Sequence, residues 1–242
     1  MKTVRTIAIS ASIIISALVL AGAYKYKFQE QHNVVVTGLA EKNFVSDLIV
    51  WRGSVYVNTP SIAEGYAQLE KYKGEVQKFI ESKGIPAEDI VFMFVNTYEN
   101  NEPTYSQDGR YTGTRFIGYT LRQEFTVESS DVVTVENCSR EISSLLAQGI
   151  TLESYQPDYY YSKLDDLKLE LIEQATADAK ARATKITSEA GSKLRRLKNA
   201  RMGVFQITGA NTNEEFSAGG SFNTSSKDKK ARITMRLEYS IK

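Results

Sequence analysis

The sequence predicts an α+β fold, with a largely antiparallel sheet and long amphipathic helices packed on one face of it. Three observations support this prediction. Runs rich in β-branched and aromatic residues recur along the chain, long segments place apolar residues at steps of three and four, and the connections between these segments are short. The resulting order is β-β-α-β-β-α-β-α-β-β. Hairpin connections between neighbouring strands favour antiparallel pairing.

Two strands and a helix are predicted first. Residues 33–58 are rich in valine and other strand formers, and the segment 38–43 between the two strands reads as a turn or bulge. Thr59 can cap the helix, Pro60 suits its first position, and Gly84 ends it. The helix carries one apolar stripe, which consists of Ile62, Tyr66, Leu69, Tyr72, Val76, Phe79 and Ile80.

The middle of the chain predicts a hairpin and a second helix. Residues 89–98 are continuously apolar, which indicates a strand covered on both faces. Residues 99–114 are polar, so we expect a protruding hairpin tip there, with the returning strand over 115–127. Asp131 is a candidate cap for a helix that ends at Gly149.

A fifth strand is predicted over 150–161, followed by the longest helix over 163–190. The helix has an unbroken stripe, made of Leu164, Leu167, Leu171, Ala175, Ala179, Ala183, Ile186 and Ala190. The alanines of this stripe let another backbone come close. Asp178 and Arg182 can pair on the solvent side of the helix.

The tail predicts two closing strands, over 194–208 and 231–241. The segment 209–230 between them consists largely of glycine, serine, asparagine, threonine and charged residues, so we expect it to be a mobile loop.

The N-terminal segment indicates export. Lys2 and Arg5 precede the uncharged residues 6–24, in which an apolar stretch at 7–20 is followed by small residues at 21–23. Positive charge, an apolar run and small residues are typical of a signal peptide. The exported protein is therefore expected in the periplasm or cell envelope, with residues 28–242 as its extracytoplasmic domain.

The fate of residues 1–27 stays open between a cleaved signal peptide and a single membrane anchor. Residues 6–24 reach the lower end of the length that a membrane span needs, about 20 residues. Lys25 and Lys27 add positive charge on the far side. A third reading is a buried core helix, although the segment has no polar face to point at water.

Composition excludes several function classes. The net charge is +1, from 30 basic and 29 acidic residues, so no overall field attracts nucleic acid and no such partner is expected. The single cysteine, Cys138, excludes an intramolecular disulfide framework and a Cys-rich metal site. The single histidine, His32, excludes a two-histidine metal site and most acid–base schemes. We expect no cofactor and no enzymatic activity.

Two motifs, in this order, resemble the SIMPL domain family of bacterial envelope proteins. Residues 34–38 read Val-Val-Val-Thr-Gly, a Val-x-Val-x-Gly strand near the start of the domain. Residues 175–183 belong to an Ala-rich helix that ends at Ala190-Gly191 before the closing strands. One departure is Ser46-Asp47, where the family often has Pro-Asp. The resemblance implies an exported protein without established enzyme activity, with some relatives linked to oxidative-stress defence and some that assemble into rings.

Tyrosines form the main candidate for a contact surface. Tyr155 precedes a tyrosine triplet in the fifth strand, and strand alternation places Tyr159 and Tyr161 on one face. Tyrosine is common at interfaces because it brings contact area at low entropic cost. The sequence therefore predicts Tyr155, Tyr159 and Tyr161 as an oligomer or ligand contact, with plain sheet packing as the alternative.

For the other candidate sites, a purely structural interpretation is also available. Glu99, Glu102 and Asp108 could bind a hard cation such as calcium, but they lack an EF-hand spacing and read equally as a solvated loop. Cys138 lies on an apolar stripe, where a thiol is usually inert rather than a peroxide sensor. His32 reads as a solvated linker residue.

A basic run and a glycine pair complete these candidates. The run at 193–198 could touch anionic lipid or form a solvated strand edge. The pair Gly219-Gly220 lacks the context of a nucleotide-binding loop.

The sequence thus predicts a non-enzymatic envelope protein that acts by self-assembly or scaffolding, as a homo-oligomer. The alternative is a soluble periplasmic binding module for a small ligand or a partner peptide. A hydrolase is a third reading.

Overall fold

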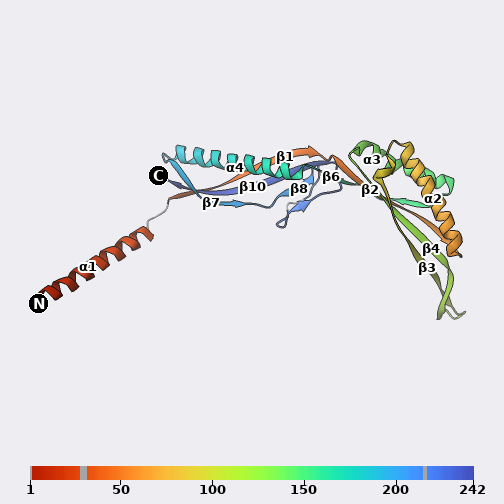
Figure 1. Cartoon of the computed structure of the whole chain (residues 1–242), viewed down its shortest axis with the longest axis horizontal. Helices are drawn as coiled ribbons and strands as arrows, with labels where there is room; N and C mark the ends of the chain where they lie inside the picture. Colours follow the sequence, from red (N-terminus) through yellow and green to blue (C-terminus); the bar gives the residue numbers. More distant parts are fainter. Residues whose placement is uncertain (1, 28–31, 215–216) are drawn as a thin grey trace. The chain divides into compact units, whose positions relative to one another are not determined.

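The computed structural model describes residues 2–27, 32–214 and 217–242, and it confirms the α+β class (Figure 1). Its strands form two five-stranded sheets. Sheet A has the order β1-β10-β8-β9, with β7 also paired to β10; these strands are β1 (Asn33–Val45), β10 (Asp228–Ile241), β8 (Gln206–Gly209), β9 (Ser221–Phe222) and β7 (Leu194–Met202). Sheet B has the order β3-β4-β2-β5, with β6 also paired to β2; these strands are β3 (Ile90–Tyr105), β4 (Tyr111–Ser129), β2 (Leu48–Thr59), β5 (Leu152–Ser154) and β6 (Asp158–Tyr160).

Pairing is antiparallel throughout sheet B and between β10 and both β7 and β8, whereas β8 and β9 pair in parallel. The chain forms two compact units. Unit 1 contains residues 1–39, 174–203 and 234–242, and unit 2 contains 40–173 and 204–233. β1, β10 and the long helix α4 (Leu164–Glu189) contribute residues to both units.

The core of unit 2 lies between sheet B and the helices α2 (Ile62–Ser82) and α3 (Val132–Glu141), which cover the same face of the sheet (Figure 1). Alternation along β2 turns Ile49, Trp51 and Val55 into this core, where each is fully buried. Trp51 Nε1 donates to Ser154 Oγ at 3.0 Å, so the buried indole N–H has a partner. This arrangement agrees with the predicted packing of amphipathic helices on one sheet face.

The predicted cap of α3 and the predicted glycines after α2 and η2 are confirmed, whereas the predicted start of α2 is wrong. Asp131 accepts a hydrogen bond from Thr134 N at 3.1 Å and so caps α3, as expected. Thr59 is not the cap of α2 and Pro60 is not its first residue, because the N-cap is Ser61 and the helix begins at Ile62. Ser61 makes no side-chain cap bond, and Thr59 Oγ1 accepts from Ser61 N at 3.2 Å within the turn before the helix. After α3 the chain continues as the short helix η2 (Ile142–Gln148) and stops at Gly149, whose φ is +79°.

The hairpin of β3 and β4 differs from the prediction in two ways. The polar segment 99–114 is mostly paired strand, since the register runs from Glu99 opposite Tyr119 to Tyr105 opposite Tyr111. Both faces of this ribbon are largely exposed, so its sequence shows no apolar alternation. The expectation that residues 89–98 are covered on both faces is also wrong. Val91 is 53% exposed and Phe94 is 77% exposed.

The predicted turn at 38–43 is wrong, because β1 runs without a break through these residues and the chain turns at Ser46-Asp47. Gly38 lies within β1 and packs against α4 instead of forming a turn. A Cβ atom at this position would lie 2.2 Å from the carbonyl oxygen of Ala175 and 2.5 Å from the backbone nitrogen of Ala179. The glycine therefore permits the close approach of β1 and α4 that the alanine stripe predicted.

The fifth predicted strand, 150–161, is split into β5 and β6, which pair with different parts of β2. On α4 the buried stripe ends at Thr187 rather than Ile186, which is 52% exposed. In the segment 209–230, which was predicted to be a mobile loop, β9 pairs with β8; residues 215 and 216 lie outside the described residues.

The N-terminal helix α1 (Lys2–Lys27) exposes the side chains of residues 10–25, so the reading as a buried core helix is wrong. The predicted apolar segment starts at Thr6, and the side chains of residues 1–9 lie outside those described. Among the described residues, no helix is long and apolar enough to cross a membrane.

Candidate functional site

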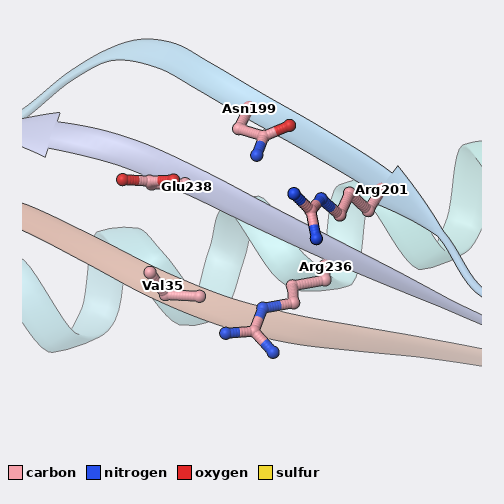
Figure 2. Close-up of a pocket in the computed structure, with 5 residues that line it drawn as sticks. All are labelled: Val35, Asn199, Arg201, Arg236 and Glu238. Atoms are coloured by element: carbon pink, nitrogen blue, oxygen red, sulfur yellow. The ribbon is translucent and has the colours of Figure 1, made fainter.

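A pocket of about 230 Å³ lies in unit 1, on the sheet face that points away from α4 (Figure 2). Three strands line it: β1 supplies Val35, β7 supplies Asn199 and Arg201, and β10 supplies Arg236 and Glu238. Because side chains alternate along a strand, the burial of β10 on its other face leaves its arginine and glutamate on the open face. The residues buried on that other face are Met235, Leu237 and Tyr239.

The register of β7 against β10 brings the polar residues of the pocket together. Arg236 lies directly opposite Arg201, and Glu238 lies directly opposite Asn199. In such pairs the Cβ atoms are about 4.5–5.5 Å apart. Glu238 Oε1 accepts a hydrogen bond from Asn33 Nδ2 at 2.8 Å, which holds this carboxylate at one end of the pocket.

The two arginines of the pocket are unpaired. Within the described residues, neither guanidinium group has a hydrogen bond or an ion pair. By contrast, Arg122 donates to both carboxylate oxygens of Glu153, at 2.8 and 3.0 Å. Two free cations beside an amide can bind an oxyanion, whereas the pocket lining contains no hydroxyl or thiol nucleophile.

The predicted tyrosine contact does not converge on one site. Tyr155 is 41% exposed, and its hydroxyl donates to Glu153 Oε2 at 2.9 Å. Tyr159 is only 7% exposed and lies in the core of unit 2, where burial raises the pKa of its hydroxyl. Tyr161 packs against Phe44 with ring centroids 4.8 Å apart. An interface role stays a prediction, and Tyr155 is the most accessible of the three.

The weaker candidates do not form a site either. Glu99, Glu102 and Asp108 lie along the β3–β4 hairpin, where Glu102 pairs with Arg115 at 2.8 Å. In the part of the chain that the structure describes, no group of three or more His, Cys, Asp and Glu side chains could hold a metal ion. Burial raises the pKa of Cys138 to about 11, so the thiol lacks the exposed, acidic character of a redox sensor.

A buried lysine in β10 forms hydrogen bonds with the segment that connects β8 to β10. Lys229 is 2% exposed, and its Nζ donates to the carbonyl oxygen of Asn223 at 2.5 Å. Asn223 Nδ2 in turn donates to Glu214, whose other oxygen accepts from Gly209 N at 3.1 Å. Burial lowers the pKa of Lys229 to about 8, although Glu214 and Asp158 oppose this shift.

We expect the pKa of Lys229 to make stability rise with pH. Below pH 8 this lysine is charged in the folded and the unfolded chain, so the cost of burying the charge is fully present. Above pH 8 the folded chain loses the proton first, and the free energy of unfolding rises by about 1 kcal/mol from pH 8 to 9. Urea denaturation of the wild type and of Lys229→Met measures this rise.

The variant provides the control for this rise, because it lacks the titrating group. The window stops at pH 9 because Cys138, with its raised pKa, lowers stability at higher pH. Equal pH slopes in the two proteins would contradict the assignment to Lys229.

The arginine pocket is not among the sites that the sequence predicted. Strand alternation could have placed Arg236 and Glu238 on one face. The β7 residues that lie opposite Arg236 and Glu238 depend on the register between the two strands, which shifts at a bulge between Glu238 and Tyr239. No local sequence pattern predicts this bulge.

Comparisons with known proteins identify the family and leave the activity open. No curated protein matches the chain significantly. One solved structure with 16% sequence identity is described as "a putative amidohydrolase/peptidase from Burkholderia cenocepacia". The match covers 54% of this chain and 31% of that chain, with a TM-score of 0.22. The family model described as "SIMPL: Protein of unknown function (DUF541)" matches residues 34–239. The chain therefore belongs to the SIMPL family.

Proposed function

We propose that this SIMPL protein acts outside the cytoplasm, without covalent chemistry, by assembling with copies of itself through the edge of sheet B. The observation that carries this proposal concerns β3, the last strand of sheet B. Among the described residues it pairs with β4 alone, and it exposes large apolar side chains. Val91, Met93 and Phe94 are 53%, 41% and 77% exposed. An apolar edge of this kind is a template for pairing with another chain.

A bulge in β3 concentrates the apolar side chains at the edge. Between Phe92 and Val95 the register shifts, so Met93 and Phe94 together face one residue of β4. Gln123 Nε2 donates to the carbonyl oxygen of Met93 at 2.7 Å, which holds the bulge from the side of β4. The first part of β3, from Ile90 to Tyr98, contains no charged residue and no proline, which are two of the usual protections of an exposed edge.

A second copy of the chain suits this edge. In a two-fold dimer the same strand meets itself antiparallel, so one apolar strand supplies both halves of the contact. No charge of β3 between Ile90 and Tyr98 opposes such a pairing. A partner peptide that adds a strand to the same edge is the binding-module alternative.

The proposed location rests on the N-terminal segment. Lys2 and Arg5 precede an apolar run, and in α1 the side chains of residues 10–25 are exposed. Exposed apolar side chains suit a segment that the export machinery reads. N-terminal sequencing of the protein from fractionated cells distinguishes a cleaved signal peptide from a retained segment.

Replacing Phe94 by lysine is expected to convert the assembled protein to a monomer. A charge at the edge opposes strand pairing, and Phe94 is too exposed to contribute much to the fold. Native mass measurement at micromolar concentration, on the protein as cells accumulate it, should give a multiple of the monomer mass for the wild type and the monomer mass for Phe94→Lys.

Leu169→Lys is the matched control, because Leu169 is 67% exposed on α4 and should not affect assembly. Circular dichroism checks that both variants are folded. A monomeric wild type, or loss of assembly in both variants alike, would count against the β3 edge.

A further inference from the structure

We propose that the arginine pocket of unit 1 is a binding site for a phosphate-type oxyanion. The juxtaposition that carries this inference is Arg201 of β7 directly opposite Arg236 of β10, with Asn199 beside them (Figure 2). The site lies within unit 1 and does not involve the β3 edge, so it goes beyond the proposed assembly.

The arginine pair lowers the stability of the free protein. Like charges directly opposite each other in an antiparallel sheet repel. Neither guanidinium group has a partner among the described residues, whereas Arg52, Arg122 and Arg182 are each ion-paired. An oxyanion between the two arginines would replace their repulsion by two charge-assisted attractions.

The lining residues indicate the kind of ligand. Each guanidinium group can donate two parallel hydrogen bonds to a tetrahedral oxyanion, and the Asn199 amide can donate another. Glu238 leaves the lining with one negative and two positive charges, and its carboxylate can accept from a hydroxyl group next to the anion. Val35 adds a small apolar wall. A volume of about 230 Å³ suits a phosphate group with a small substituent rather than a large ligand.

The positive charge of β7 attracts anions to this part of the surface. This strand carries Arg195, Arg196, Lys198 and Arg201 and no acidic residue. Such a field raises the local concentration of an anionic ligand. A phosphate group can come from a free phosphate compound or from the headgroup of an anionic lipid, and the same two arginines would recognise both.

Inorganic phosphate is the first probe, added to the purified protein at constant ionic strength with chloride as the reference anion. We expect a saturable rise of the melting temperature in phosphate. The rise should be lost, or need at least tenfold more phosphate, in Arg236→Gln and in Arg201→Gln. Arg195→Gln is the control, since it removes the same charge from β7 but lies outside the pocket lining.

Vesicles of phosphatidylglycerol, with phosphatidylcholine vesicles as the reference, are the second probe. Binding that is selective for phosphatidylglycerol and is lost in Arg236→Gln but kept in Arg195→Gln would assign the phosphate group to a lipid headgroup. A saturable effect of inorganic phosphate alone would assign it to a free compound. Either result supports the site.

The unliganded variants show whether loss of binding reflects loss of folding. Arg236→Gln relieves the repulsion from Arg201, so its melting temperature without phosphate should equal or exceed that of the wild type. The proposal is overturned if neither probe binds. It is also overturned if phosphate acts equally on the wild type, Arg236→Gln and Arg201→Gln.

Discussion

Replacing Gly38 by alanine is expected to lower the free energy of unfolding of unit 1 by about 3 kcal/mol. The added Cβ would lie 2.2 Å from the carbonyl oxygen of Ala175 and 2.5 Å from the nitrogen of Ala179. Both are backbone atoms of α4, so the clash cannot be relieved by a side-chain rotation. Asp178 Oδ2 accepts from Leu39 N at 2.9 Å, and a shift of the helix would also strain this hydrogen bond.

Chemical denaturation followed by circular dichroism measures this loss, and hydrogen exchange of the amides in 34–39 localises it to β1. Gly74→Ala is the matched control. A Cβ at Gly74 meets nothing within 4 Å, and alanine is the better helix former, so this variant should be more stable by about 1 kcal/mol. A Gly38→Ala protein as stable as the wild type would show that β1 and α4 are not in close contact.

Replacing Phe125 by alanine is expected to lower the free energy of unfolding of unit 2 by about 4 kcal/mol. Phe125 is fully buried, and its ring meets Trp51 edge-on at a centroid distance of 5.3 Å and Phe92 at 5.8 Å. It also covers Gly53, the residue directly opposite on β2. Truncation therefore leaves a cavity at the centre of the core, where several neighbours would lose contacts at once.

Trp51 is the only tryptophan, so its fluorescence reports the unfolding of unit 2 directly. The same change at Leu169, which is 67% exposed and lies outside the β3 edge, serves as the control and should alter stability by less than about 0.5 kcal/mol. If the two alanine variants unfold at the same denaturant concentration, Phe125 is not a core residue.

Local chemistry explains which parts of the fold were predictable. The Asp131 cap and the ends of helices at Gly84 and Gly149 depend on residues a few positions apart, and each is found where the sequence placed it. The Asp178–Arg182 pair on α4 is likewise present, at 2.9 Å. Such features depend on residues within about one helical turn of each other, so they can be predicted from the sequence alone.

The β3 edge shows why burial was harder to predict. The run from Ile90 to Val95 is apolar throughout, and a strand covered on both faces would have the same composition. The bulge at Met93 and Phe94 and the place of β3 at the end of sheet B decide that these side chains are exposed. Strand order within a sheet depends on distant parts of the chain, and the run itself does not encode it.

By itself, the sequence determined the family, the α+β class, the order of the long helices and strands, and the glycines that end α2 and η2. It did so because periodicity, capping and motifs are properties of short segments. It did not show that 150–161 divides into β5 and β6, or that 194–208 divides into β7 and β8. The tertiary structure alone decided that Gly38 lies against α4 and that Arg201 faces Arg236. These pairs join segments far apart in the chain, and the sheet register and backbone distances that create them arise only when the strands and helices pack together.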